Sequence, residues 1–271
     1  MGFKKLFLIS DWEQFRKQGR GCGRCDKYRP GFLIREVCST AQRERVHIRR
    51  FGRTFEMMSH GETLTLLQLD WNDRVIEVRE QFPLDPAITT KIAQDFNLYH
   101  PGYTRGGTIM TTDFLVTYRT PSGKDYLKAY QIKRSEDDYA DGRTRAKLKI
   151  EAEYWKRSNI PWCVVLSASY NKILCDNLEH LHPYRETTYT VDDLIFLFRI
   201  LSEEISANPH LCYEDAASGE IEPLPDRMVS LSVSDGLKVL LSRKMLSFPI
   251  SEKPLAKCHL RDFKENCHVP S

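Results

Sequence analysis

Hydrophobic residues recur along this chain with two periodicities, and each change of periodicity marks the boundary of a predicted element. Alternating apolar and polar positions predict strands, and amphipathic runs behind a capping residue predict helices. The predicted strands of the first part span residues 32–39, 44–51, 75–84, 113–118, 126–133 and 160–167, and the last of them is expected to be buried. The predicted helices span 10–18, 59–71 and 144–159. The segment 19–31 is rich in Gly and Arg, which indicates a flexible basic loop. The segment 85–111 is predicted to be irregular. This order predicts an α/β fold around a mixed sheet.

The pattern changes after residue 168. Helices are predicted at 171–181, 190–205 and 234–244, followed by a short strand at 245–250. Helices that precede a strand and a basic tail resemble a small winged-helix domain. We therefore expect a first domain over 1–168 and a winged-helix-like, α-rich domain over 169–271 that binds protein partners.

The composition predicts a folded protein and its cellular compartment. Hydrophobic residues make up 41% of the 271 residues, which suits a packed core and not a disordered chain. We expect no signal peptide and no membrane span, because no apolar stretch reaches about 18 residues. Eight cysteines without a secretory signal are typical of a cytoplasmic protein with reduced thiols.

The charge is distributed unevenly. Residues 1–61 carry 14 basic and 6 acidic side chains, 62–161 carry 15 of each, and 162–271 carry 11 basic and 16 acidic ones. A basic first segment suits a polyanion such as DNA, because neutralised phosphates release counterions. A solvated surface explains the same charge equally well. The acidic last segment suggests a protein-contact module.

The hairpin formed by the fourth and fifth predicted strands gathers chemical groups at one end. Strand pairing brings Asp113 opposite Gln131 and Lys133, which share a face because strand side chains alternate. Carboxylate and amide oxygens, with the backbone carbonyl of Ile132, are ligands that Mg²⁺ prefers. Glu62 on the preceding helix offers a third side-chain oxygen. Such a metal site suits phosphodiester hydrolysis, with Lys133 orienting water or stabilising the developing charge.

Each of these residues also has a purely structural interpretation. Ser59 and Glu62 have capping-box spacing, in which the Glu62 side chain returns to the backbone N–H of Ser59. Asp113 could equally be a turn residue at the end of a strand. Lys133 could equally be a charged residue on an edge strand, where such charges prevent pairing with another chain. The spacing alone leaves both interpretations open.

Basic residues in two segments are candidate DNA contacts. One pair lies in the Gly-rich loop and the other on the predicted helix 144–159, where a solvated face stabilised by i,i+4 partners is the alternative. The four residues are Arg20, Arg24, Lys147 and Lys149.

Cysteine spacing raises the alternative of a zinc site. Cys22 and Cys25 have zinc-knuckle spacing, but a second tight C-x-x-C pair is missing. Completing the site would require residues from the far end of the chain, namely Cys258, His259, Cys267 and His268.

Several segments in order resemble the TnsA family, the endonuclease subunits of heteromeric bacterial transposases of the Tn7-like kind. They are GRGCGRCDKYRPGFLIREV, LLQLDWNDRVIEVREQFPL, TDFLV, QIK and EAEYWKRSNIPW. The resemblance covers residues 19–166; over 170–271 it rests on helical pattern and length. Cys22, Cys25 and Gly31-Phe32 depart from the family pattern, which affects the expected N-terminal DNA contact and leaves the catalytic core as it is.

The resemblance implies a restriction-endonuclease-like PD-(D/E)xK core that cuts DNA at the 5′ ends of a transposon. It makes Glu62, Asp113, Gln131 and Lys133 the catalytic set. Glu62, Asp113, Gln131 and the Ile132 carbonyl would hold Mg²⁺, with two ions expected and Mn²⁺ able to substitute. Lys133 would assist the attacking water.

The resemblance also implies partners. A transposase subunit, TnsB, would cut and join the 3′ ends, and an AAA ATPase regulator, TnsC, would contact the C-terminal domain. The expected location is the bacterial cytoplasm, at the nucleoid during transposition. Two rival functions remain: a free-standing restriction-type or repair nuclease, and a non-catalytic adaptor between DNA and the ATPase.

Overall fold

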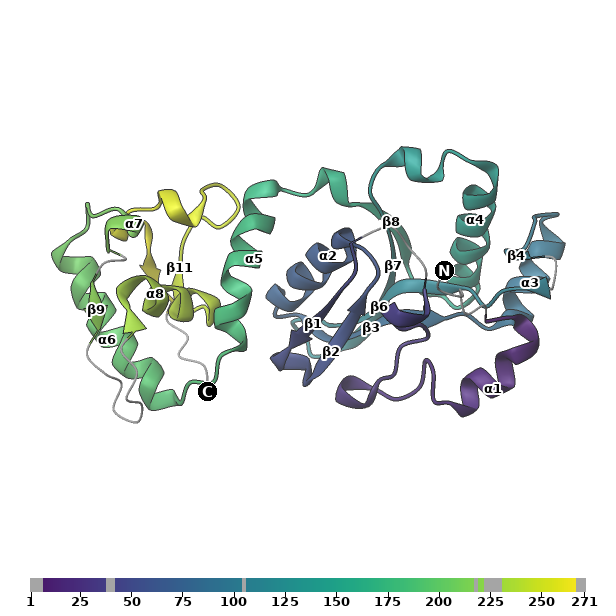
Figure 1. The fold of residues 1–271 in the computed structure, drawn as a ribbon, viewed down its shortest axis with the longest axis horizontal. Coiled ribbons are helices and arrows are strands. Elements are labelled where there is room, and N and C mark those ends of the chain that lie inside the picture. Colours follow the sequence, from purple (N-terminus) through teal and green to yellow (C-terminus); the bar gives the residue numbers. More distant parts are fainter. Residues whose placement is uncertain (1–6, 38–41, 104–105, 217–218, 222–230, 267–271) are drawn as a thin grey trace. The chain divides into compact units, whose positions relative to one another are not determined.

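The computed structural model describes residues 7–37, 42–103, 106–216, 219–221 and 231–266 of the chain. It divides into two compact units, Met1–Ser169 and Tyr170–Ser271. Each unit has its own sheet pairing and helices (Figure 1), and the two are described separately.

A four-stranded sheet forms the centre of the first unit. Its strands are β3 (Val75–Pro83), β6 (Thr111–Arg119), β7 (Asp125–Lys133) and β8 (Trp162–Leu166), in that order. The β3–β6 and β6–β7 pairs are antiparallel, and β8 runs parallel to β7. The predicted mixed sheet and the β6–β7 hairpin are confirmed. β8 is half-buried along its length, although its run of apolar residues predicted a buried strand.

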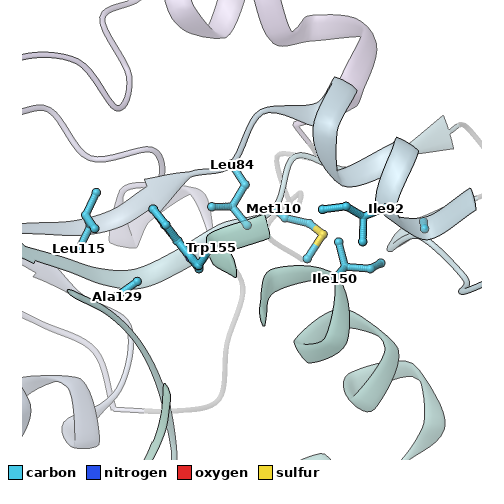
Figure 2. Close-up of a cluster of buried hydrophobic side chains, with 8 residues drawn as sticks. Leu84, Ile92, Met110, Leu115, Ala129, Ile150 and Trp155 are labelled. Atoms are coloured by element: carbon cyan, nitrogen blue, oxygen red, sulfur yellow. The ribbon is translucent and has the colours of Figure 1, made fainter. Parts of the chain in front are cut away.

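Helices cover one side of this sheet and a helix with a hairpin covers the other (Figure 1). On one side lie α3 (Pro86–Asp95) and α4 (Gly142–Arg157), and on the other lie α2 (His60–Trp71) and the strands β1 (Glu44–Ile48) and β2 (Arg53–Met57). Figure 2 shows the cluster beneath α3 and α4, where Met110 lies close to Ile92 and Ile150. Burial of such side chains stabilises a fold by about 1.5–3 kcal/mol each.

The hairpin beside α2 differs from the prediction. Residues 32–39 do not form a strand where they are described; they hold a 3-10 turn over Ile34–Glu36. β1 pairs instead with β2, which the sequence did not indicate, through a tight turn closed by Gly52. Gly52 adopts φ +66°, a conformation that glycine takes without steric cost.

The Gly-rich segment 19–31 is packed, which corrects the prediction of a flexible loop. Arg20 is only 6% exposed, and its guanidinium forms a bidentate ion pair with Glu36. Tyr28 is buried as well, and its hydroxyl donates to the Glu80 carbonyl. These contacts reach far along the chain, so local composition did not reveal them. The predicted N-terminal helix is present as α1 (Trp12–Lys17), preceded by a 3-10 turn over Ile9–Asp11.

The stretch predicted to be irregular contains a helix. α3 begins with Asp85, whose carboxylate accepts the Ala87 N–H, and Pro86 occupies its first turn. Both are helix-start signals that the sequence carried. Two further two-residue strands follow, β4 (Gly102–Tyr103) and β5 (Gly106–Gly107).

The second unit is mainly helical. Its helices are α5 (Lys172–Glu186), α6 (Val191–Ala207), α7 (Tyr213–Ala216) and α8 (Val233–Ser242), and its strands are β9 (Glu220–Ile221), β10 (Leu231–Ser232), β11 (Leu246–Ser247) and β12 (Lys264–Glu265). β11 pairs with β12 and β9 with β10, both antiparallel. The Thr190 cap predicted for α6 is confirmed, with Asp193 completing the capping box. α8 packs against α5 and α6.

One buried asparagine connects α5 to the chain after β11. The Asn177 amide donates to the carbonyls of Ile250 and Lys253, and its oxygen accepts the Leu255 N–H. The side chain is 3% exposed, so these bonds satisfy groups that water does not reach. Within the described parts of the chain, no helix combines the length and apolar character needed to cross a bilayer.

Candidate active site

The end of the β6–β7 hairpin brings a carboxylate and an amide into direct contact. Asp113 Oδ2 accepts from Gln131 Nε2 and from the Ile132 backbone N–H, each at 2.7 Å. Asp113 is 8% exposed and Gln131 is 4% exposed. The two bonds tie the carboxylate of one strand to its neighbour, so the strands themselves fix the direction of the side chain.

Glu62 reaches the same place from the first turn of α2. Its carboxylate accepts from the Met58 N–H at 3.1 Å, the Ser59 hydroxyl at 3.0 Å and Gln81 Nε2 at 3.2 Å. Glu62 is 5% exposed, and it lines a cavity together with Asp113. The structure therefore brings the two predicted carboxylates to one site.

The capping interpretation of Glu62 is correct in part. The Ser59 hydroxyl accepts the Glu62 N–H, so Ser59 is the N-cap of α2. The Glu62 carboxylate accepts the N–H of Met58 and not that of Ser59 as a capping box requires. Capping and placement at the cavity thus occur together.

Burial raises the pKa of both carboxyl groups. The pKa of Glu62 rises to about 8 because the group is desolvated and because Asp113 lies near it. Desolvation also raises the pKa of Asp113, and the Lys133 ammonium and the Ile132 N–H oppose that rise. Two buried carboxylates that face each other without a cation are unfavourable when both are charged. A divalent cation between them would remove this cost.

The cavity at this site has a volume of about 1350 Å³. It lies within the first unit, between α2, the end of the β6–β7 hairpin and the beginning of α4. Basic side chains contribute to its lining beside the two carboxylates; they are His60, Lys133, Arg134 and Lys147. Glu36 and Asp138 line the cavity as well. Carboxylates together with basic side chains in one cavity suit a phosphodiester, whose phosphates need positive charge and whose hydrolysis needs a metal.

The donor set fits a hard divalent cation. Gln131 Oε1 is buried without a hydrogen-bond partner, which is costly unless another group binds it. A metal ion supplies such a partner, because Mg²⁺ favours carboxylate and amide oxygens. The described residues contain no group of three or more His, Cys, Asp and Glu side chains able to hold a metal, so the amide oxygen is essential to this set.

A third acid, Glu151, lies behind the site and was not foreseen. It is fully buried on α4, and burial raises its pKa to about 7. Its Oε1 accepts from Thr112 and from Trp162 Nε1, and Thr112 in turn accepts from Trp155 Nε1. This network fixes the strand next to Asp113. The sequence signal was limited to an acid on the apolar face of a predicted helix.

Gln81 on β3 is the second residue that the sequence did not reveal. It appeared as one more position of an alternating strand, yet it is 5% exposed and hydrogen-bonded to Glu62. Lys147, predicted as a DNA contact, is half-buried and lines the cavity, and its charge lowers the pKa of Asp113. Lys149 on the same helix is exposed.

The loop residues proposed as DNA contacts differ from each other. Arg20 is buried in its ion pair with Glu36, so its guanidinium is not available to a phosphate, and we leave it out of the DNA interface. The Arg24 side chain is 68% exposed while its guanidinium contacts Glu77. Cys22 and Cys25 are free thiols, Cys258 lies in the other unit, and Cys267 and His268 fall outside the described residues.

Comparison with known proteins agrees with this geometry. Residues 72–167 match the family model described as "TnsA-like endonuclease N terminal". Among curated proteins, the chain is similar to "Transposon Tn7 transposition protein TnsA" of Escherichia coli, with 34% identity over 169 residues. That match spans 62% of this chain and 61% of the relative, less than two thirds of either. The segment matched by the family model contains Asp113, Gln131 and Lys133, and over it the chain is similar to TnsA-like endonucleases.

Proposed function

We propose that this protein is the metal-dependent DNA endonuclease subunit of a heteromeric transposase, which hydrolyses the strand at the transposon 5′ ends. The observation that carries the proposal is the pairing of Glu62 and Asp113 with the unpartnered oxygen of Gln131, in a cavity that Lys133, Arg134 and Lys147 also line. The match of the surrounding segment to TnsA-like endonucleases supports the same activity.

In this proposal Glu62, Asp113, Gln131 and the carbonyl of Ile132 would hold Mg²⁺, with two ions expected and Mn²⁺ able to substitute. When bound, the metal neutralises phosphate charge and lowers the pKa of the attacking water. Glu62 and Asp113 supply the negative charge that attracts the cation, and their hydrogen bonds hold them in place before it arrives.

Lys133 orients the attacking water and stabilises the charge that develops on the phosphate. It follows Gln131 by two positions on β7, lines the cavity and lies close enough to Asp113 to lower its pKa. Cleavage leaves a 5′-phosphate and a 3′-hydroxyl. Reactions of this class depend mainly on positioning and charge stabilisation, which is what a rigid strand end provides.

DNA would be held by basic side chains around the cavity. The charge of Lys147 lowers the pKa of both Asp113 and Glu151, and Lys147 would contact the phosphates nearest the cut. Arg24 and Lys149 are exposed and would contact the backbone further away. Contacts of this kind add affinity without reading sequence, so the target would be chosen by partners.

The partners in this proposal are a TnsB-type transposase and a TnsC-type AAA ATPase. The second unit would be the winged-helix-like module that binds the ATPase. Its helices α6 and α8 with the β11–β12 pair are compatible with that fold, and the acidic charge of residues 162–271 suits protein contacts. The E. coli relative is named a transposition protein, which supports a role inside such an assembly.

A strand-resolved cleavage assay tests the function. The protein is combined with its genomic-neighbour transposase and ATPase, transposon-end DNA and Mg²⁺, and each strand is followed separately. We expect 5′-strand nicks that disappear with Asp113→Ala while 3′ cutting persists. Asp125→Ala is the matched control, since Asp125 is an exposed acid at the opposite end of the same hairpin.

Other outcomes identify the rival functions. Specific cutting by the protein alone, without a transposase, would indicate a restriction-type or repair nuclease. Unchanged 5′ cutting by Asp113→Ala would indicate an adaptor and would return the hairpin end to a structural role.

A further inference from the structure

Gln81 adopts a left-handed backbone conformation inside a strand. Its φ is +47°, although β3 keeps the same register with β6 on both sides, with Glu80 opposite Phe114 and Phe82 opposite Thr112. Residues with side chains seldom adopt this region, and such positions concentrate where a protein needs a particular side-chain direction. The conformation therefore raises the question of what the Gln81 side chain does.

The Gln81 amide joins two residues that line the cavity. Its Nε2 donates to Glu62 Oε2 at 3.2 Å, and its Oε1 accepts from the Thr111 hydroxyl at 3.2 Å. With the amide oxygen accepting from the Thr111 hydroxyl and the NH₂ group donating to the Glu62 carboxylate, the two bonds together hold the amide in one orientation.

The N-terminal loop fixes the backbone of Gln81. The Gly31 N–H donates to the Gln81 carbonyl at 3.0 Å, and a Cβ at Gly31 would lie 2.6 Å from that oxygen. The Gly31 carbonyl in turn accepts from Arg20 at 2.7 Å, and Arg20 is paired with Glu36. A buried chain of contacts thus runs from the loop to the strand residue that holds Glu62.

We infer that Gln81 is a positioning residue that directs the Glu62 carboxylate toward the other proposed metal ligands. The other two donors to Glu62, Met58 and Ser59, lie directly before its own helix. Among the described donors, Gln81 is the one from the central sheet, which also carries Asp113 and Gln131. It therefore sets the position of the helix-borne ligand relative to the strand-borne ones. This inference rests on the proposed metal site.

The test is a Mn²⁺ titration of the full-length protein followed by electron paramagnetic resonance. Gln81→Met keeps the length and volume of the side chain and removes both hydrogen bonds. We expect the dissociation constant for Mn²⁺ to rise about 10-fold or more, as for other residues that orient metal ligands. In the cleavage assay, the Mg²⁺ concentration at half-maximal rate should rise by a similar factor, while the rate at saturating Mg²⁺ changes little.

Three further variants make the result decisive. Thr111→Val removes the bond that orients the Gln81 amide and should raise the Mn²⁺ dissociation constant in the same direction by a smaller factor. Gln94→Ala removes an exposed glutamine of α3 and should leave it unchanged. Asp113→Ala should abolish Mn²⁺ binding, and if it does not, the proposed metal site itself is wrong.

A wild-type Mn²⁺ affinity in Gln81→Met, together with lost binding in Asp113→Ala, would overturn the inference and leave the proposed function standing. If Gln81→Met fails to fold by circular dichroism, Thr111→Val decides. An unchanged Mn²⁺ affinity in that variant overturns the inference as well.

Discussion

The two ends of the β6–β7 hairpin carry similar residue types, which are exposed to solvent at one end and buried at the other. At the end near the turn, Arg119 and Asp125 form an ion pair at 2.9 Å, with both side chains exposed. At the other end, Asp113 and Gln131 are buried, and Gln131 Oε1 has no hydrogen-bond partner. Water solvates the first pair, so little depends on it. The second pair is desolvated and incompletely hydrogen-bonded, which is the arrangement that the proposed metal site requires.

Removing the acid at the buried end is the largest expected effect. Asp113→Ala should lower the cleavage rate by about a hundred- to a thousandfold or more, because it removes a ligand and the charge that attracts the metal.

Without metal, Asp113→Asn should melt at a higher temperature than wild type at pH 8, since burial raises the pKa of Asp113 and its charged form is unfavourable. Calorimetry without divalent ions measures this. A lower melting temperature for Asp113→Asn would contradict the assigned cost of charge.

A substitution at Gly31 in the N-terminal loop should weaken metal binding at the buried end of the hairpin, because Gly31 contacts the backbone of Gln81. In Gly31→Ala the new methyl group would meet the Gln81 carbonyl, and overpacking of this kind costs about 1–3 kcal/mol. We expect a lower melting temperature and weaker Mn²⁺ binding together. Gly123→Ala, at a turn glycine with open space around it but φ +81°, serves as the control that strains the backbone without touching the site. It should lower stability and leave Mn²⁺ binding unchanged.

The pH dependence of stability tests the protonation state of Glu151, the acid behind the buried end of the hairpin. Glu151 has a pKa of about 7 in the folded protein and an ordinary value of 4.5. Because its folded pKa is raised, the protonated group contributes stability below pH 4.5, and this contribution is lost as the pH rises to 7. Glu151→Gln should therefore gain melting temperature relative to wild type between pH 5 and 8. An identical pH dependence in both proteins would show that Glu151 is charged in the fold.

The smallest effect is expected at the exposed end. Replacing both Arg119 and Asp125 with Ala should leave the cleavage rate and the melting temperature unchanged within error. The hairpin register is set by the pairing that runs from Phe114 to Asp125, and not by this ion pair. A loss of cleavage in this double variant would mean that the two ends are coupled, and the contrast between them would fail.

The sequence predicted the parts of the fold that depend on local pattern. The β6–β7 hairpin, α2 and α4 follow from alternation, capping and helical spacing, and this was enough to bring Glu62, Asp113 and Gln131 together. α3 was missed although Asp85 and Pro86 marked its start, because the surrounding Gly and Pro residues suggested irregular chain.

The remaining features depend on contacts between distant residues. The loop at 19–31 was predicted to be flexible from its glycines, but the ion pair of Arg20 with Glu36 and the bond from Tyr28 to Glu80 order it. Gln81 lacked any signal, since its role comes from a backbone angle and from Glu62, 19 residues earlier. No periodicity in a single sequence encodes such pairings.

The hydrogen bonds of Asn177 determine how far the second unit can be shortened. They connect α5 to residues 250–255, which contain little regular structure and would be an obvious place to truncate. A protein cut before residue 250 would lose all three partners of the Asn177 side chain, and each lost hydrogen bond costs about 0.5–1.5 kcal/mol. Proteases should likewise spare this stretch despite its irregular backbone, because the bonds to α5 hold it.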